Sequence, residues 1–305
     1  MRRVIILVTS VMACLVLAAP PAPASTKPLP VPYNFIPAAL LGGAPNSNAP
    51  GTNDWSCKPS AEHPRPVVLV HGTFGNRSTN WRTYGPLLKN NGYCVFALTY
   101  GTLPGLPYPV QALGGLGDMR ASAEQLQAFV AEVLTATGAD KVDLVGHSQG
   151  TLMPAYYVKY LGGASSVHNY VSLAPLWHGT DTAPISTVIK VLRLDLDTVP
   201  VCTACGQFDP DSAFMAQVRD GGAAVPGINY VNIMTKFDEL VRPYTSGIED
   251  GMTNIVLQDH CKLDQSEHFE IAADRNATIH VLNALDPANP RPLGCVLVLP
   301  FVGGI

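Results

Sequence analysis

The sequence has no internal repeat, no block of like charge and no apolar run outside its N-terminus that is long enough to cross a bilayer. Its 19 Lys and Arg are outnumbered by 23 Asp and Glu, so the net charge is −4. A chain without a basic excess lacks the electrostatic attraction that phosphate backbones require. We therefore expect no nucleic-acid partner.

The N-terminal apolar run has the features of a secretory signal. Arg2 and Arg3 precede the run 4–19, and Ala22-Pro23-Ala24 offers a cleavage site between small residues. Prolines end the run, which is short for a transmembrane anchor, so we predict a signal peptide over 1–24 and a secreted, extracellular protein. Cleavage removes two of the 19 basic residues and no acid, leaving 17 against 23 acids and a net charge of about −6.

Cysteines are few and even in number once the signal peptide is removed. The six that remain are Cys57, Cys94, Cys202, Cys205, Cys261 and Cys295. In an exported chain this count predicts three disulfides, whose pairing the sequence alone leaves open. Cys202 and Cys205 form a CxxC, but neither a second CxxC nor a His pair accompanies it. We interpret them as a short structural disulfide and predict no metal site and no cofactor.

The sequence predicts an N-terminal extension followed by a catalytic domain. Residues 25–64 are rich in Pro, Ala, Asn and Gly and predict an irregular N-terminal extension, whereas 65–305 predict one catalytic α/β domain. Apolar and β-branched runs predict strands at 67–70, 94–98, 142–146, 170–173, 230–234 and 254–257. Helices are expected at 81–89 and 121–137, with a long loop at 101–117. This alternation favours a mostly parallel sheet with helices on both faces.

Gly146-His147-Ser148-Gln149-Gly150 lies between a predicted strand and a stretch compatible with a helix. This arrangement is typical of a nucleophile elbow, a sharp turn that holds a strained serine above the end of the sheet. Glycine two residues before and after the serine removes side chains that would collide with the neighbouring strand and helix. The pattern predicts Ser148 as a nucleophile.

Serine is a weak nucleophile unless a general base takes its proton, and that base is oriented by a third group. Three histidines follow the elbow at a suitable distance. His260 adjoins a cysteine, and His280 falls in a periodic apolar stretch that predicts a packed helix. His268 lies in the polar loop 264–269, so we predict His268 as the base.

The orienting acid should sit where a strand ends, since sites of parallel sheets form at the carboxyl ends of the strands. Asp238 follows the predicted strand 230–234 and is our choice. Glu239 is adjacent and is expected to point elsewhere. Asp259 and Asp264, which are loop acids near the predicted base, are the alternatives.

An oxyanion hole needs two or more donors. The residue after the nucleophile supplies the backbone N–H of Gln149, and the loop after the first strand supplies Thr73, which offers an N–H and a hydroxyl. His71 and His147 flank this region and are interpreted as structural.

Taken together, these residues resemble the secreted class 2 lipases, the actinobacterial triacylglycerol lipases of the α/β-hydrolase superfamily, and are similar to the fungal lipase B group. The matching stretches are 53–57, 68–73, 146–150, 173–175, 238–241 and 264–268. The resemblance implies a triad of Ser148, Asp238 and His268 and an oxyanion hole of Thr73 and Gln149. It also implies the disulfides Cys57–Cys94, Cys202–Cys205 and Cys261–Cys295. The match is weakest over 176–215, where substrate contacts are expected.

We therefore predict a secreted triacylglycerol lipase or carboxylesterase that acts through an acyl-enzyme on Ser148, with a lipid or ester substrate and no stable protein partner. Apolar residues that could line an acyl pocket or belong to the ordinary core are Leu103, Leu106, Tyr108, Val110, Leu113, Leu176, Trp177, Ile185, Val188, Ile189 and Leu192. The same triad would also serve an acyltransferase or a polyester or cutin hydrolase. A different class is a non-catalytic binding protein on a hydrolase fold. Glycosylation sequons begin at Asn76 and Asn276.

Overall fold

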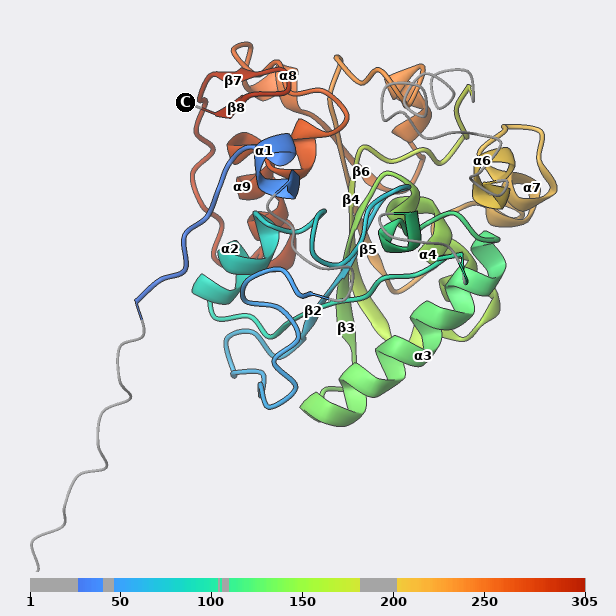
Figure 1. Cartoon of the computed structure of the whole chain (residues 1–305), viewed down its shortest axis with the longest axis horizontal. Coiled ribbons are helices and arrows are strands. Elements are labelled where there is room, and N and C mark those ends of the chain that lie inside the picture. Colours follow the sequence, from blue (N-terminus) through green and yellow to red (C-terminus); the bar gives the residue numbers. More distant parts are fainter. Residues whose placement is uncertain (1–26, 41–46, 104, 106–109, 182–201, 305) are drawn as a thin grey trace, which may run out of the picture.

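A computed structural model describes residues 27–40, 47–103, 105, 110–181 and 202–304. Its centre is a six-stranded sheet (Figure 1). The strand order is β2-β1-β3-β4-β5-β6, and every neighbouring pair is parallel. The strands are β1 (Val67–Val70), β2 (Val95–Ala97), β3 (Val142–His147), β4 (Val167–Leu173), β5 (Asn229–Met234) and β6 (Thr253–Val256). The predicted parallel sheet is confirmed.

Helices cover both faces of this sheet (Figure 1). The helices are α1 (Phe35–Leu40), α2 (Tyr84–Asn90), α3 (Met119–Thr137), α4 (Gln149–Tyr160), α6 (Thr203–Gln207), α7 (Ala213–Arg219), α8 (Leu257–His260) and α9 (Arg275–Leu285). One apolar cluster joins the sheet to α3, α4, α6 and α7, and a second joins the opposite face to α2 and α9. Along β1, Val68 and Val70 belong to the first cluster, and Val67 and Leu69 belong to the second. All four side chains are buried, which explains why the strand is continuously apolar rather than alternating.

Helix and strand boundaries differ from the sequence prediction where side chains or tertiary contacts decide them. Helix α3 starts two residues early because the Asp118 carboxylate accepts hydrogen bonds from the N–H groups of Arg120 and Ala121. It ends, as predicted, before Gly138, whose φ of 76° suits glycine. Helix α2 starts at Tyr84 rather than at Trp81.

The described part of the extension is tied to the rest of the fold. It contains α1, whose first residue donates its N–H to the Glu270 carboxylate at 2.9 Å. Farther along, the N–H of Asn53 donates to the Val95 carbonyl, and its side chain bonds the N–H and C=O of Ala97. These contacts join residues that are far apart in the sequence, so local composition does not reveal them.

Three disulfides join Cys57 to Cys94, Cys202 to Cys205 and Cys261 to Cys295, which are the pairs that the family resemblance implies. The third bond connects the segment after β6 to the C-terminal region, where β7 (Val298–Leu299) and β8 (Gly303–Gly304) form a two-stranded hairpin. The predicted signal peptide lies outside the described residues. None of the helices in the described ranges is long and apolar enough to cross a membrane.

Both glycosylation sequons lie in buried positions. Asn76 and Asn276 are each 5% exposed. The amide of Asn76 donates to the Ala112 carbonyl, and that of Asn276 donates to the Asp264 carboxylate and the Val296 carbonyl. Because these amides are already used inside the fold, the two sequons are poor glycan acceptors in the folded protein.

Candidate active site

Ser148 occupies the turn between β3 and α4, with φ of 53° and ψ of −123°. A non-glycine residue rarely adopts a positive φ, so the tight turn maintains this strained backbone. A Cβ on Gly150 would lie 1.9 Å from the carbonyl oxygen of Val70, and one on Gly146 would lie 2.1 Å from that of Gly150. The two glycines are therefore sterically required, as the elbow pattern predicts.

The structure brings Ser148, His268 and Asp238 together. Nε2 of His268 is 2.9 Å from the Ser148 hydroxyl, and its Nδ1 is 2.9 Å from both carboxylate oxygens of Asp238. The His268 and Asp238 side chains are only 3% and 2% exposed. The serine and the histidine are 120 residues apart in sequence. One ring thus lies between a hydroxyl and a buried carboxylate, the arrangement that proton transfer from serine requires.

The surrounding carboxylates determine the protonation of His268. Burial is the largest single effect and by itself lowers the pKa of an imidazole, whereas Asp238 raises it through its charge and its hydrogen bond. Glu239 and Glu267 act in the same direction, so the pKa of His268 is raised above its ordinary 6.5. The site therefore favours the imidazolium that forms when the ring accepts a proton.

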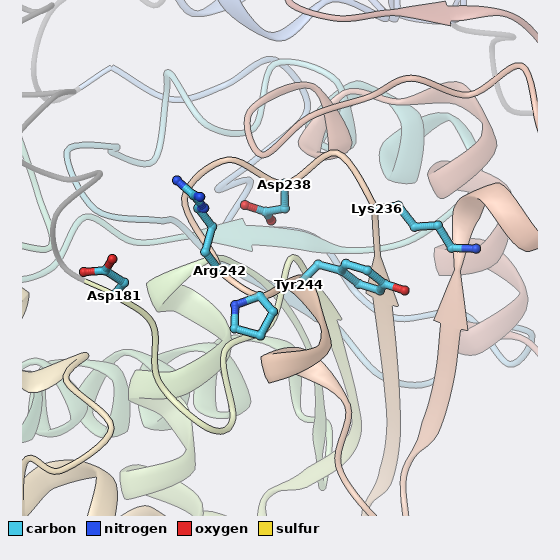
Figure 2. Close-up of a pocket in the computed structure, with 6 residues that line it drawn as sticks. Asp181, Lys236, Asp238, Arg242 and Tyr244 are labelled. Atoms are coloured by element: carbon cyan, nitrogen blue, oxygen red, sulfur yellow. The ribbon is translucent and has the colours of Figure 1, made fainter.

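Asp238 is held by the turn that follows β5. One of its oxygens accepts hydrogen bonds from the N–H groups of Leu240 at 2.9 Å and Val241 at 2.7 Å. Figure 2 shows Asp238 at the wall of an open pocket. The other residues that line the pocket are Asp181, Lys236, Arg242, Pro243 and Tyr244.

The two alternative acids have other partners. Asp259 is exposed and pairs with Lys236 at 2.6 Å. Asp264 is buried and accepts hydrogen bonds from the hydroxyl of Ser266 and the amide of Asn276. Of the four acids considered from the sequence, Asp238 is the one that is hydrogen-bonded to the His268 ring.

The two predicted oxyanion residues lie side by side next to Ser148. The Thr73 hydroxyl donates to the side-chain oxygen of Gln149 at 2.8 Å. Gln149 is fully buried and begins α4, so its backbone N–H is one of those that a helix leaves without an intrahelical partner.

Three other histidines considered from the sequence have distinct surroundings. His71 is buried and close to the Gly72 carbonyl, and burial lowers its pKa to about 4. His280 lies in α9, and burial lowers its pKa to about 4. His260 is exposed. None of these three rings contacts Ser148 in the described hydrogen bonds, whereas the ring of His268 does.

Sequence reasoning missed the contacts that Glu239 and His147 make with His268. A Glu239 oxygen accepts a hydrogen bond from the backbone N–H of His268 at 3.1 Å. On the other side, Nε2 of His147 lies 2.8 Å from the His268 carbonyl oxygen. These contacts span 29 and 121 residues, so no local pattern reports them.

Two of the candidate acyl-pocket residues belong to the core. Leu176 and Trp177 are buried in the cluster around α3 and α4, and the Trp177 N–H donates to the Asn232 side chain. Leu103 and Leu113 are half-buried. The other candidates lie outside the described residues or have undescribed side chains, namely Leu106, Tyr108, Val110, Ile185, Val188, Ile189 and Leu192. Within the described ranges, no three His, Cys, Asp or Glu are grouped so that they could hold a metal ion.

A parallel sheet with helices on both faces, and a serine at the turn from its third strand into a helix, define an α/β-hydrolase fold. Residues 64–280 match the family described as lipase (class 2). The chain belongs to this family.

Sequence relatives match a shorter stretch. A triacylglycerol lipase from Pseudarthrobacter phenanthrenivorans is 38% identical over 96 residues, which are 30% of this chain and 27% of the relative. A triacylglycerol lipase from Burkholderia plantarii is also 38% identical over 96 residues and is matched over 24% of its length. The chain thus spans about a quarter of these curated relatives.

Solved structures show the same fold over more of the chain. Aspergillus fumigatus lipase B aligns with a TM-score of 0.60 and 19% identity over 81% of this chain and 57% of its own. The mature form of the Bacillus licheniformis lipase BlEst2 aligns with a TM-score of 0.56 and 17% identity, over 75% of this chain and 94% of its own. At these identities the likeness concerns the fold alone.

Proposed function

We propose that the protein is a secreted lipase or carboxylesterase that hydrolyses esters through an acyl-enzyme on Ser148. The observation that carries this proposal is the continuous hydrogen-bonded line from the Ser148 hydroxyl through His268 to Asp238. Membership of the class 2 lipases supports an ester substrate, and the two triacylglycerol lipases among its relatives support an acylglycerol.

In the proposed reaction, Ser148 attacks the ester carbonyl while Nε2 of His268 takes the hydroxyl proton. The imidazolium then gives this proton to the departing alcohol, leaving an acyl group on the serine. Water attacks the acyl group with His268 again as the base, and the carboxylic acid is released. Asp238 keeps its charge throughout, holding Nδ1–H and stabilising the imidazolium.

The oxyanion formed in both steps is assigned to Thr73 and Gln149. Ser148 immediately precedes α4, so the negative oxygen would form near a helix N-terminus, where the helix dipole favours negative charge. The backbone N–H groups of Gln149 and Thr73 are the proposed donors; the Thr73 hydroxyl joins them only by giving up its hydrogen bond to the Gln149 side chain. Loss of one such donor typically lowers kcat by about 10²–10³-fold.

Export is part of the proposal. Three disulfides support folding in an oxidising compartment, because thiols in the cytosol are kept reduced. The predicted signal peptide over 1–24 supplies the route. Expression with and without residues 1–24 tests this: only the full-length chain should reach the medium, shortened at its N-terminus.

The decisive experiment measures hydrolysis of p-nitrophenyl esters from short to long acyl chains, with Ser148→Ala in parallel. We expect the wild-type protein to hydrolyse esters with medium and long acyl chains. The rate should fall about 10⁶-fold in Ser148→Ala. Activity restricted to the shortest chains would define a short-chain esterase. Equal rates in the two proteins would overturn the assignment of Ser148.

A further inference from the structure

The backbone of His268 has two partners that the proposed reaction does not use. Its N–H donates to Glu239 at 3.1 Å, and its carbonyl oxygen accepts from His147 at 2.8 Å. His268 is 3% exposed, so without these partners both backbone groups would be buried with no hydrogen bond. Ser148 and Asp238 meanwhile occupy the two ring nitrogens.

His268 needs such support because it belongs to a loop rather than to the sheet. It lies outside every strand and helix of the described chain, between α8 and the 3-10 turn Glu270–Ala272. Asp238 constrains the rotation of the ring but leaves the position of its backbone to other contacts. A reacting group displaced by about 1 Å can lose about 10²-fold in rate.

We propose that Glu239 and His147 are positioning residues that hold the backbone of His268 from both sides, so that its ring meets Ser148 and Asp238 at once. This inference rests on the proposed function. The places of the two residues in the chain suit such a role, since Glu239 follows Asp238 and His147 precedes Ser148. Each thus connects His268 to the segment that carries one of its ring partners.

The chemistry of His147 fits a permanent donor. A carbonyl oxygen only accepts, so Nε2 of His147 carries the proton in this contact. Burial, and then the nearby His268, lower the pKa of His147 to about 3, so it remains neutral when His268 becomes charged. The rings lie 5.1 Å apart between centroids, where two positive charges would repel strongly. The Phe35 ring, 6.0 Å from that of His147, packs beside this donor.

Glu239 acts on His268 through its charge as well as through its hydrogen bond. Burial raises the pKa of Glu239, and the nearby His268 opposes that rise. The charged groups that face His268 are the carboxylates Asp238, Glu239 and Glu267, all of which favour the imidazolium. Replacing Glu239 by glutamine keeps a hydrogen-bond acceptor but removes its charge, whereas alanine removes both.

These differences define a variant series. In Glu239→Ala and His147→Phe we expect kcat for a p-nitrophenyl ester to fall about 10–100-fold with KM within about twofold, because ring placement changes while substrate contacts remain. Glu239→Gln should keep most of kcat but move the acid limb of the pH profile to lower pH. His147→Gln, which still donates an N–H, should recover part of the activity lost in His147→Phe. The exposed residues Glu132 and His260 supply the matched controls Glu132→Gln and His260→Phe.

A titration that needs no catalysis separates this inference from the proposed function. NMR of protein with ¹³C-labelled histidine, with the His268 signal identified by its loss in His268→Gln, should show a lower His268 pKa in Glu239→Gln than in wild type. If wild type shows no Ser148-dependent hydrolysis but this shift appears, the proposed function fails and the contact with Glu239 stands. An unchanged pKa in Glu239→Gln, or kcat within about twofold of wild type in folded Glu239→Ala and His147→Phe, would overturn the inference.

Discussion

The elbow that carries Ser148 and the segment that carries His268 are fixed by different forces. Ser148 donates its N–H to the Leu173 carbonyl of the neighbouring strand, and its own carbonyl accepts from Thr151, so main-chain bonds and close packing hold it. The His268 segment is held by buried acids, namely Asp264, Glu267, Glu270 and Asp274. The Glu267 carboxylate, for example, accepts hydrogen bonds from the backbone N–H groups of Phe269, Glu270 and Phe301.

The two halves of one site should therefore respond to different perturbations. A main-chain turn between a strand and a helix is insensitive to pH but intolerant of added volume. A loop held by carboxylates depends in addition on the ionisation of those carboxylates. Burial raises the pKa of Glu267 to about 7 and that of Glu270 to about 8, so the loop changes charge within the neutral range.

Adding one methyl group to the elbow should have the greatest consequence. Gly150→Ala places a Cβ 1.9 Å from the Val70 carbonyl, a backbone atom of the central sheet that cannot move aside. We expect destabilisation above about 3 kcal/mol, measured by urea denaturation. Gly206→Ala is the control, since nothing lies within 4 Å of its added Cβ. A Gly150→Ala protein as stable as wild type would contradict the description of the elbow.

Next in size is the loss of the His268 orienter. Asp238→Asn keeps the volume but loses the charge, so the wrong histidine tautomer is favoured and kcat should fall about 10⁴-fold while the fold persists. Asp259→Asn changes an exposed acid paired with Lys236 and should leave kcat within about twofold. If Asp259→Asn were inactive and Asp238→Asn active, Asp259 rather than Asp238 would be the acid that orients His268.

The pH profile separates the two regions without any mutation. Because nearby carboxylates raise the pKa of His268 above 6.5, the neutral base is lost as pH falls through that raised value. We expect kcat/KM to decrease about tenfold per pH unit on the acid side, with a midpoint above 6.5. A profile that stays flat down to about pH 4 would exclude His268 as the base.

A more modest change concerns the stability of the His268 side. Folding raises the pKa of Glu270 to about 8, whereas the unfolded chain ionises near about 4.3, so the wild-type free energy of unfolding falls as pH rises between these values. Glu270→Gln cannot ionise and keeps an acceptor for the Phe35 N–H. It should be more stable than wild type by at least about 2 kcal/mol at about pH 9 and equal to it at about pH 4, by urea denaturation.

The exposed α3 residue Glu124 provides the control variant Glu124→Gln, which should show no such difference. A Glu270→Gln protein whose stability follows the wild-type pH dependence would show that Glu270 is already ionised in the folded state.

The fold and the elbow could be predicted from the sequence because each depends on local patterns. The run Val67–Val70 is apolar at every position because both faces of β1 are covered, and glycines bracket Ser148 because backbone passes close to both. Boundaries were less accurate. Strand β6 ends at Val256 because Leu257 already begins α8, which an apolar run cannot indicate.

The sheet, the elbow and the family thus followed from the amino-acid order alone, since apolar runs, turn chemistry and motif spacing act within a few residues. The way in which His268 and its loop are held emerged only in three dimensions, because Glu239, His147 and the ordered extension at Phe35 contact this region across 29 to 235 residues of chain. Buried carboxylates gain their hydrogen bonds and their raised pKa values only when the complete fold excludes water from them.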